Sequence, residues 1–168
     1  IEWHPSGKFL TIITEKDGGL KLMQYAFEKD EMTERNLLYF DKILDFDYSD
    51  DGSKMVFSAV KNSLTDIYVY NLASSSSEQI TSDLADDFNP NFINQSTQIL
   101  FSSNRSKDTI GGALQPTNKQ FDLFVYDYKN KNKMLQRLTN TITDNETYTF
   151  EIKNQQYLYL SDQSGIRN

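Results

Sequence analysis

One short pattern recurs along this chain and constrains its fold more than any other feature. Residues 48–58 and 92–102 align without a gap, and each run has the character of a strand, a polar turn and a second strand. Residues 3–12 and 151–160 follow the same frame. A recurring pattern of this kind is typical of repeat architectures, in which each repeat folds as one supersecondary unit.

Four turn positions define the period of the repeat. Gly7, Gly52, Ser96 and Gln155 occupy the same place in the pattern, and their spacings are 45, 44 and 59 residues. The longer spacing contains the stretch 106–120, whose Gly, Pro, Thr and Asn residues predict a surface loop. Without this insertion the period is again about 45 residues, which is the length of a four-stranded propeller blade.

Each repeat contains the residues for two further strands after the strand–turn–strand pattern. Residues 66–72 and 122–128 are rich in aromatic and β-branched side chains, as buried strands are. Residues 78–81 and 136–139 then predict the fourth strand. Each repeat is therefore expected to form one antiparallel sheet of four strands.

The predicted fold is an all-β propeller segment of about three and a half four-stranded antiparallel blades, part of a larger ring. The chain is treated as one propeller segment, 1–168, with blades at approximately 1–44, 45–85, 86–143 and, incomplete, 144–168. The pattern is least clear early in the chain. Residues 19–27 fit a third strand, whereas residues 28–35 fit either a turn of helix or a long loop.

The repeat resembles the WD-like repeats of TolB-like propellers, which are also found in tricorn and prolyl-oligopeptidase-type propellers. The resemblance rests on an Asp-Gly turn, a strand ending in Phe-Ser, an Asp-Ile-Tyr-Val-Tyr strand and a Gln-Ile-Thr close, and on residues 102–105 followed by 122–126. It implies a closed ring of roughly six to eight blades, so the remaining blades are expected in the same polypeptide. The structural positions of the motif are Gly52, Asp66, Arg105 and Asp122. An ion pair between Arg105 and Asp122 is the natural expectation.

Composition and charge exclude several classes of function. The chain has 24 acidic and 17 basic residues and a formal charge of −7, which disfavours nucleic acid as a partner. Its apolar runs are too short to cross a bilayer, so no membrane insertion by this segment is expected. His4, the one histidine, occupies a turn position, and no nucleophile elbow accompanies it. The segment is therefore predicted to hold no catalytic residues, no cofactor and no metal.

Two acidic patterns invite a chemical interpretation but fit turns better. Residues 47–52 match the first half of a calcium-binding loop, but Ser58 stands where that loop needs a bidentate Glu. The three aspartates within 83–87 lie between strands, where Asp commonly serves turns, so we do not interpret them as a glycosidase pair.

One face of the disc is the best candidate for a binding surface. In a four-stranded blade the connections 82–88, 106–120 and 140–147 emerge on the same side, and rigid scaffolds commonly bind partners through such loops. The candidate residues are the charged and polar ones of these connections: Asp83, Asp86, Asp87, Lys107, Asp108, Asn118, Lys119, Asp144 and Glu146.

These observations predict a noncatalytic, protein-binding propeller scaffold. By its resemblance to TolB-like propellers it is expected in the periplasm or cell envelope of a bacterium, with one or more protein partners. The alternative is a propeller that gates substrate for a serine peptidase whose catalytic domain lies outside this segment.

Overall fold

The strands form one sheet after another along the chain. The computed structural model describes residues 1–111, 117–153 and 156–163, and within them fourteen strands form four antiparallel sheets. The first sheet comprises β1 (Glu2–Trp3), β2 (Phe9–Lys16), β3 (Gly19–Ala26) and β4 (Glu31–Asn36). The second comprises β5 (Lys42–Tyr48), β6 (Lys54–Lys61), β7 (Leu64–Asn71) and β8 (Ser76–Gln79). The third comprises β9 (Asp87–Ile93), β10 (Gln98–Arg105), β11 (Thr117–Tyr126) and β12 (Gln136–Arg137), and the fourth β13 (Glu146–Lys153) and β14 (Gln156–Ser161).

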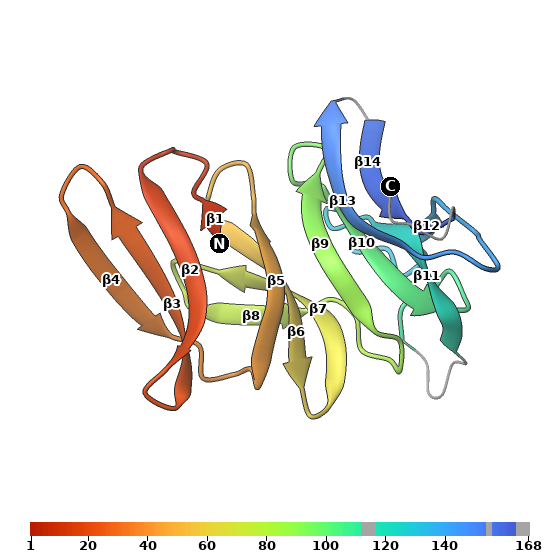
Figure 1. The fold of residues 1–168 in the computed structure, drawn as a ribbon, viewed down its shortest axis with the longest axis horizontal. Coiled ribbons are helices and arrows are strands. Elements are labelled where there is room, and N and C mark those ends of the chain that lie inside the picture. Colours follow the sequence, from red (N-terminus) through yellow and green to blue (C-terminus); the bar gives the residue numbers. More distant parts are fainter. Residues whose placement is uncertain (112–116, 154–155, 164–168) are drawn as a thin grey trace.

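Figure 1 shows these sheets side by side, from the red first sheet to the blue β13–β14 pair. In each sheet the strands follow chain order, which is the meander of a propeller blade. The first strands of neighbouring sheets, β5, β9 and β13, contact one another. The all-β, blade-by-blade fold expected from the repeat is thereby confirmed.

Two details of the strand assignment come only from the structure. The stretch that fits either a helical turn or a loop contains β4 instead, which pairs with β3 over six residues. The second sheet begins at Lys42, slightly before the boundary assigned between residues 44 and 45. No helix long and apolar enough to cross a membrane occurs in the described ranges.

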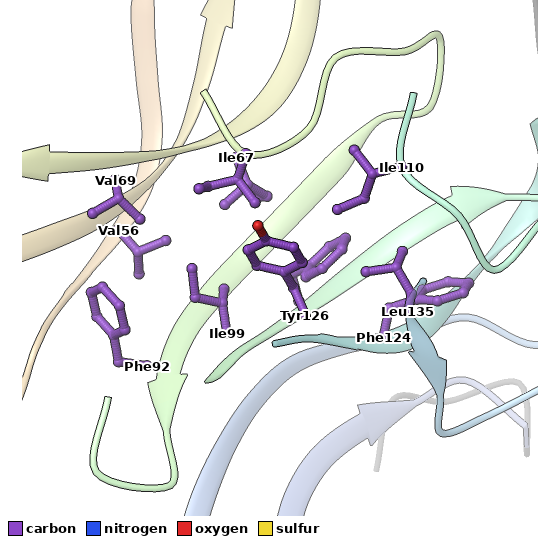
Figure 2. Packing of buried hydrophobic residues seen from close by; sticks show 11 residues of the cluster. Val56, Ile67, Val69, Phe92, Ile99, Ile110, Phe124, Tyr126 and Leu135 are labelled. Carbon is purple, nitrogen blue, oxygen red and sulfur yellow. The ribbon is translucent and has the colours of Figure 1, made fainter. Parts of the chain in front are cut away.

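Residues 67–70 of the Asp-Ile-Tyr-Val-Tyr strand have apolar or aromatic side chains on both faces because both faces are covered. Along β7, Ile67 and Val69 pack against the third sheet, whereas Tyr68 and Tyr70 belong to the cluster shared with the first sheet. Successive side chains of a strand point to opposite faces, so a strand between two neighbours needs apolar residues at every position. Figure 2 shows the cluster that Ile67 and Val69 enter between the second and third sheets.

The Phe-Ser ending of the second strand also has a structural role. The Ser58 hydroxyl donates to the backbone carbonyl of Asp87 at 2.7 Å, and the Ser102 hydroxyl donates to that of Glu146 at 2.6 Å. In both cases the acceptor lies at the start of the next sheet. The recurring serine therefore joins neighbouring sheets through a buried hydrogen bond.

The insertion differs from the loop that its composition predicts. Residues 108–110 run back beside the segment that leads into β12, where Ile110 N donates to the Lys133 carbonyl and Leu135 N to the Asp108 carbonyl, both at 2.9 Å. Ile110 and Leu135 are buried in the cluster between the second and third sheets (Figure 2). Residues 117–120 belong to β11, and 112–116 lie outside the described residues. The first part of the insertion thus covers the core and does not form a free loop.

Candidate functional site

The candidate site is a groove along the first strands of the second, third and fourth sheets. Two hollows of about 490 and 640 Å³ adjoin there, and both are lined by Asp45, Asn89 and Tyr148. The other residues lining them are Leu44, Phe88, Phe121, Asn145 and Thr147 in the first, and Glu2, Phe46, Asp47, Pro90, Asn91, Thr149, Phe150 and Leu160 in the second. We call these two hollows together the first-strand groove.

A bulge at the same place in each strand shapes the groove. Pairing with the neighbouring strand is irregular between Ile43 and Asp45, and again around Asn89 and Tyr148. Asn89 and Tyr148 have φ values of 50° and 52°. Asn adopts this left-handed conformation readily, whereas a bulky Tyr does so only against strain. A bulge redirects side chains out of the regular alternation, and Tyr148 is 54% exposed in the middle of the groove.

Side-chain hydrogen bonds link the three first strands across the floor of the groove. Asn89 Nδ2 donates to Asp45 Oδ2 at 2.8 Å, and Asn89 Oδ1 accepts from the Tyr148 backbone N–H at 3.3 Å. Asp47 Oδ2 accepts from the Phe92 backbone N–H at 2.8 Å. The polar residues of these strands therefore hold the sheets together while they line the groove.

The groove is acidic. Glu2, Asp45 and Asp47 line its larger hollow, and no Lys, Arg or His is among the described residues that line either hollow. Burial raises the pKa of Asp47 to about 7, and the nearby charge of Glu2 adds to this effect. Burial also raises the pKa of Glu2, and the nearby charge of Asp45 raises it further. Glu2 is thus repelled by both Asp45 and Asp47, the charge of the amino terminus offsets part of the rise in its pKa, and no Lys, Arg or His of the described residues forms a salt bridge with any of the three carboxylates.

The predicted binding residues divide into buried and exposed sets. Asp83, Asp87 and Glu146 are buried, which removes them from the outer surface, and Asp86 and Asp144 are half-buried. Lys107, Asp108, Asn118 and Lys119 are exposed, although Asp108 accepts a hydrogen bond from Arg137 at 2.7 Å. For the exposed residues a role in binding stays a prediction. The long connections border the groove where Phe88, Phe121 and Asn145 line the smaller hollow.

The expected ion pair between Arg105 and Asp122 was wrong. Arg105 bonds both carboxylate oxygens of Asp87, at 2.9 and 2.8 Å, and reaches Asp83 at 3.2 Å. Asp122 pairs with Arg137 instead, at 2.7 Å. Arg105 is the last residue of β10 and lies beside the connection that enters the third sheet, so it ties the beginning of that sheet to its second strand.

Asp66 in β7 and Asp122 in β11 each connect the third strand of their sheet to the segment that follows the fourth strand. Thr81 Oγ1 accepts from the Ile67 backbone N–H and lies 3.3 Å from Asp66 Oδ1. Thr139 makes the same two contacts with Leu123 and Asp122. The Asp at the start of the strand and the Thr of the close are thus partners, which explains why they recur together.

Sequence inspection missed the groove residues, although a signal for them was present. Asp45 and Asn89 occupy corresponding positions in two repeats, and so do Asp47 and Asn91. Polar residues inside a strand that is otherwise apolar indicate a solvated edge or a bulge.

Comparisons with known proteins agree with this fold. No family model matches the sequence, and no curated protein matches it. Among solved structures, TolB from Acinetobacter baumannii is similar with a TM-score of 0.65 at 15% identity, over 95% of this chain and 39% of that one. A putative TolB from Agrobacterium tumefaciens has a TM-score of 0.59 at 20% identity, over 82% of this chain and 47% of that one. The chain therefore spans less than half the length of either.

Peptidase propellers are similar as well. The tricorn protease has a TM-score of 0.54 at 19% identity, over 74% of this chain and 13% of that one. The β-propeller domain of the Trilobed protease from Pyrococcus furiosus has a TM-score of 0.51 at 12% identity, over 91% of this chain and 48% of that one. At these identities the likeness concerns the fold, and it shows that this chain has the fold of a TolB-like β-propeller segment.

Proposed function

We propose that this chain is part of a noncatalytic propeller scaffold of the bacterial cell envelope, and that it binds a protein partner through the first-strand groove and the connections beside it. One observation carries the proposal. Tyr148 is exposed in the groove while its backbone adopts a conformation that costs a bulky residue free energy. Exposed aromatic residues in hollows are the usual anchors of protein interfaces, so the strained Tyr148 is a suitable anchor.

The acidic charge of the groove favours a positively charged partner. The groove holds Glu2, Asp45 and Asp47 with no cation from the described lining, so a positively charged partner segment is complementary to it. The location in the envelope is proposed from the similarity to the two TolB structures, and it rests on analogy of fold.

Site-specific crosslinking in living cells tests the proposal. A photo-crosslinking amino acid is placed at Tyr148 of the full-length protein and, as a control, at Lys8, which is exposed and does not line the groove. We expect one envelope protein to be captured from position 148 but not from position 8, and its capture to fall when Glu2→Gln and Asp45→Asn are combined. Equal capture from both positions, or none from 148, would contradict the proposal.

A second candidate function is favoured by the peptidase propellers among the similar structures. In it, these blades gate substrate for a serine peptidase domain outside this segment. Fluorophosphonate labelling of the full-length native protein, with the intact mass read from the same sample, separates the two. A labelled serine favours the gating role, whereas an unlabelled protein with a mass that accommodates further blades favours the scaffold.

A further inference from the structure

The turn between β9 and β10 holds three consecutive residues in the left-handed conformation. Asn94, Gln95 and Ser96 have φ values of 50°, 56° and 59°. In the two preceding repeats the position of Ser96 is occupied by Gly7 and Gly52, and in each of those turns the glycine alone has a positive φ. Asn tolerates this conformation, whereas Gln and Ser adopt it only at a cost in free energy. This turn is therefore strained where its counterparts are not.

Contacts from two neighbouring sheets hold the strained turn in place. Ser96 Oγ accepts from the Asp50 backbone N–H of the second sheet at 2.8 Å. Glu151 of the fourth sheet accepts from the Asn94 backbone N–H, also at 2.8 Å. Gln95 stands between them, is exposed, and its side chain makes no hydrogen bond with a described residue. Strain that the surroundings impose in this way is concentrated at functional sites, so we ask what Gln95 could bind.

Three adjoining hollows lie around this turn. One of about 280 Å³ is lined by both Gln95 and Tyr128, one of about 340 Å³ shares Gln95 with it, and one of about 210 Å³ shares Tyr128 and Lys54 with it. We call them together the turn-face hollows. The β5–β6 and β9–β10 turns that border them lie opposite the β6–β7 hairpin (Figure 1). None of the residues lining the first-strand groove lines them, so the two sites are separate.

Most of the side chains that line the turn-face hollows carry a hydroxyl or an amide group. These groups both donate and accept hydrogen bonds. The Ser77 hydroxyl and the Gln95 amide make no hydrogen bond with the described residues, so both have capacity left for a ligand. Such a lining suits a ligand that itself donates and accepts at many points.

Charges of both signs line the turn-face hollows. Lys54 and Lys129 supply ammonium groups and Asp50 a carboxylate, and none of the three forms an ion pair with a described residue. The other carboxylates of the lining are already bonded by neighbouring side chains. With free groups of both signs, the hollows favour a ligand without net charge.

Tyr128 supplies an aromatic surface among these polar groups. It is half-buried, with its ring centre 5.9 Å from that of Phe92, and it lines two of the hollows. Burial raises the pKa of Tyr128, so its hydroxyl stays a donor at neutral pH. A sugar has a face of C–H groups that packs on an aromatic ring and an edge of hydroxyls that both donate and accept. The aromatic ring and the surrounding polar groups match these two sides of a sugar.

We propose that the turn-face hollows bind a neutral oligosaccharide, with one sugar ring on Tyr128 and its hydroxyls bonded by Gln95, Lys54 and Asp50. This site does not depend on the partner proposed for the first-strand groove. A protein fits the hollows less well, because the core of a protein interface is apolar and poor in charged residues.

Isothermal titration of the full-length protein with three neutral tetrasaccharides, cellotetraose, maltotetraose and tetra-N-acetylchitotetraose, tests the proposal. We expect at least one of them to bind, and Tyr128→Ala to weaken its binding roughly tenfold. Tyr128→Phe, which keeps the ring, should retain most of the binding. Asp45→Asn, in the first-strand groove, should leave it unchanged. If none of the three sugars binds, or if Tyr128→Ala binds as well as the parent, the proposal is overturned.

A second variant keeps the test decisive if Tyr128→Ala fails to fold. Gln95→Gly removes the amide and relieves the left-handed backbone, so it should raise the denaturant midpoint while it weakens sugar binding by about threefold or more. Ser63→Gly is the matched control, because Ser63 is exposed, has a φ of 64° and lines none of the hollows. It should raise the midpoint and leave sugar binding unchanged. A Gln95→Gly protein that binds the sugar as tightly as the parent would contradict the proposed role of this turn.

Discussion

At the scale of single residues, Gly52 shows how the repeat restricts a turn. Gly52 has a φ of +68°, and a β-carbon there would lie 2.3 Å from His4 Nε2 of the preceding sheet. Gly7 holds the same place one repeat earlier, with a φ of +69° and no atom within 4 Å of its β-carbon position. The left-handed turn is therefore common to both repeats, whereas the close approach of a neighbouring side chain exists only at Gly52.

Gly52→Ala should destabilise the protein by about 1–3 kcal/mol, since it adds a clash with His4 to the cost of a left-handed alanine. Gly7→Ala has only the cost of a left-handed alanine and should therefore lose less stability. Combining His4→Ala with Gly52→Ala should reduce the loss to about that of Gly7→Ala. Urea unfolding of the parent, the two glycine variants and the double variant measures these losses of stability. Equal losses at Gly7 and Gly52 would show that the imidazole moves away freely.

At the scale of elements, the arginines of the third sheet differ in what they stabilise. The Arg105 side chain is 2% exposed and is the ion-pair partner of two buried aspartates, Asp83 and Asp87. The Arg137 side chain is 13% exposed, and one of its two partners, Asp108, lies at the surface. Removing one partner of a buried pair leaves an uncompensated charge inside the protein, whereas surface pairs contribute little.

Arg105→Met should therefore destabilise the protein by about 3–5 kcal/mol, and Arg137→Met by less, because it leaves one buried carboxylate, Asp122, without a cation where Arg105→Met leaves two. Chemical denaturation at neutral pH checks the order of the two losses. If Arg105→Met does not fold, adding Asp87→Asn should restore part of the stability, because it removes one of the two buried carboxylate charges that the substitution leaves without a cation. Similar losses for both arginines would mean that burial does not set the strength of these pairs.

At the scale of the whole molecule, the free face of the first sheet matches a face that is buried one repeat later. Leu10, Ile12, Met23 and Tyr25 lie on that free face and are half-buried. The residues 45 positions later are Met55, Phe57, Tyr68 and Tyr70, all at most 3% exposed and packed against the first sheet. Because the same positions are apolar in both sheets, the free face is suited to contact another sheet of the same kind.

Ile12→Asn in the full-length protein should accordingly lower its stability by about 2–4 kcal/mol, as a polar residue does at a buried contact. Lys29→Asn, in an exposed turn of the same sheet, should have an effect within about 0.5 kcal/mol. Thermal unfolding of both variants makes the comparison. An Ile12→Asn protein as stable as the parent would mean that this face stays in contact with solvent.

Local chemistry was enough to predict the fold. The turn glycines, the apolar strand 66–72 and the period of about 45 residues are properties of short segments, and the order of strands in a repeat follows from them. The strand β4 is the exception, because its sequence left a helical turn and a loop open. The partners of individual charges could not be predicted in the same way. Arg105 and Asp122 are near in the repeat, yet each is paired with a different residue, because direction and burial of the side chains decide between several carboxylates.

The sequence by itself therefore determined the strand order, the sheet type and the recurring turns, since each depends on neighbouring residues and their periodicity. Only the tertiary structure decided that Asp83 and Asp87 are buried around Arg105, that part of the insertion covers the core, and that Asp45, Asn89 and Tyr148 meet in one groove. Asp45, Asn89 and Tyr148 are far apart in the chain and come together because successive sheets pack against one another. Contacts of that kind depend on the placement of whole sheets, which no local pattern records.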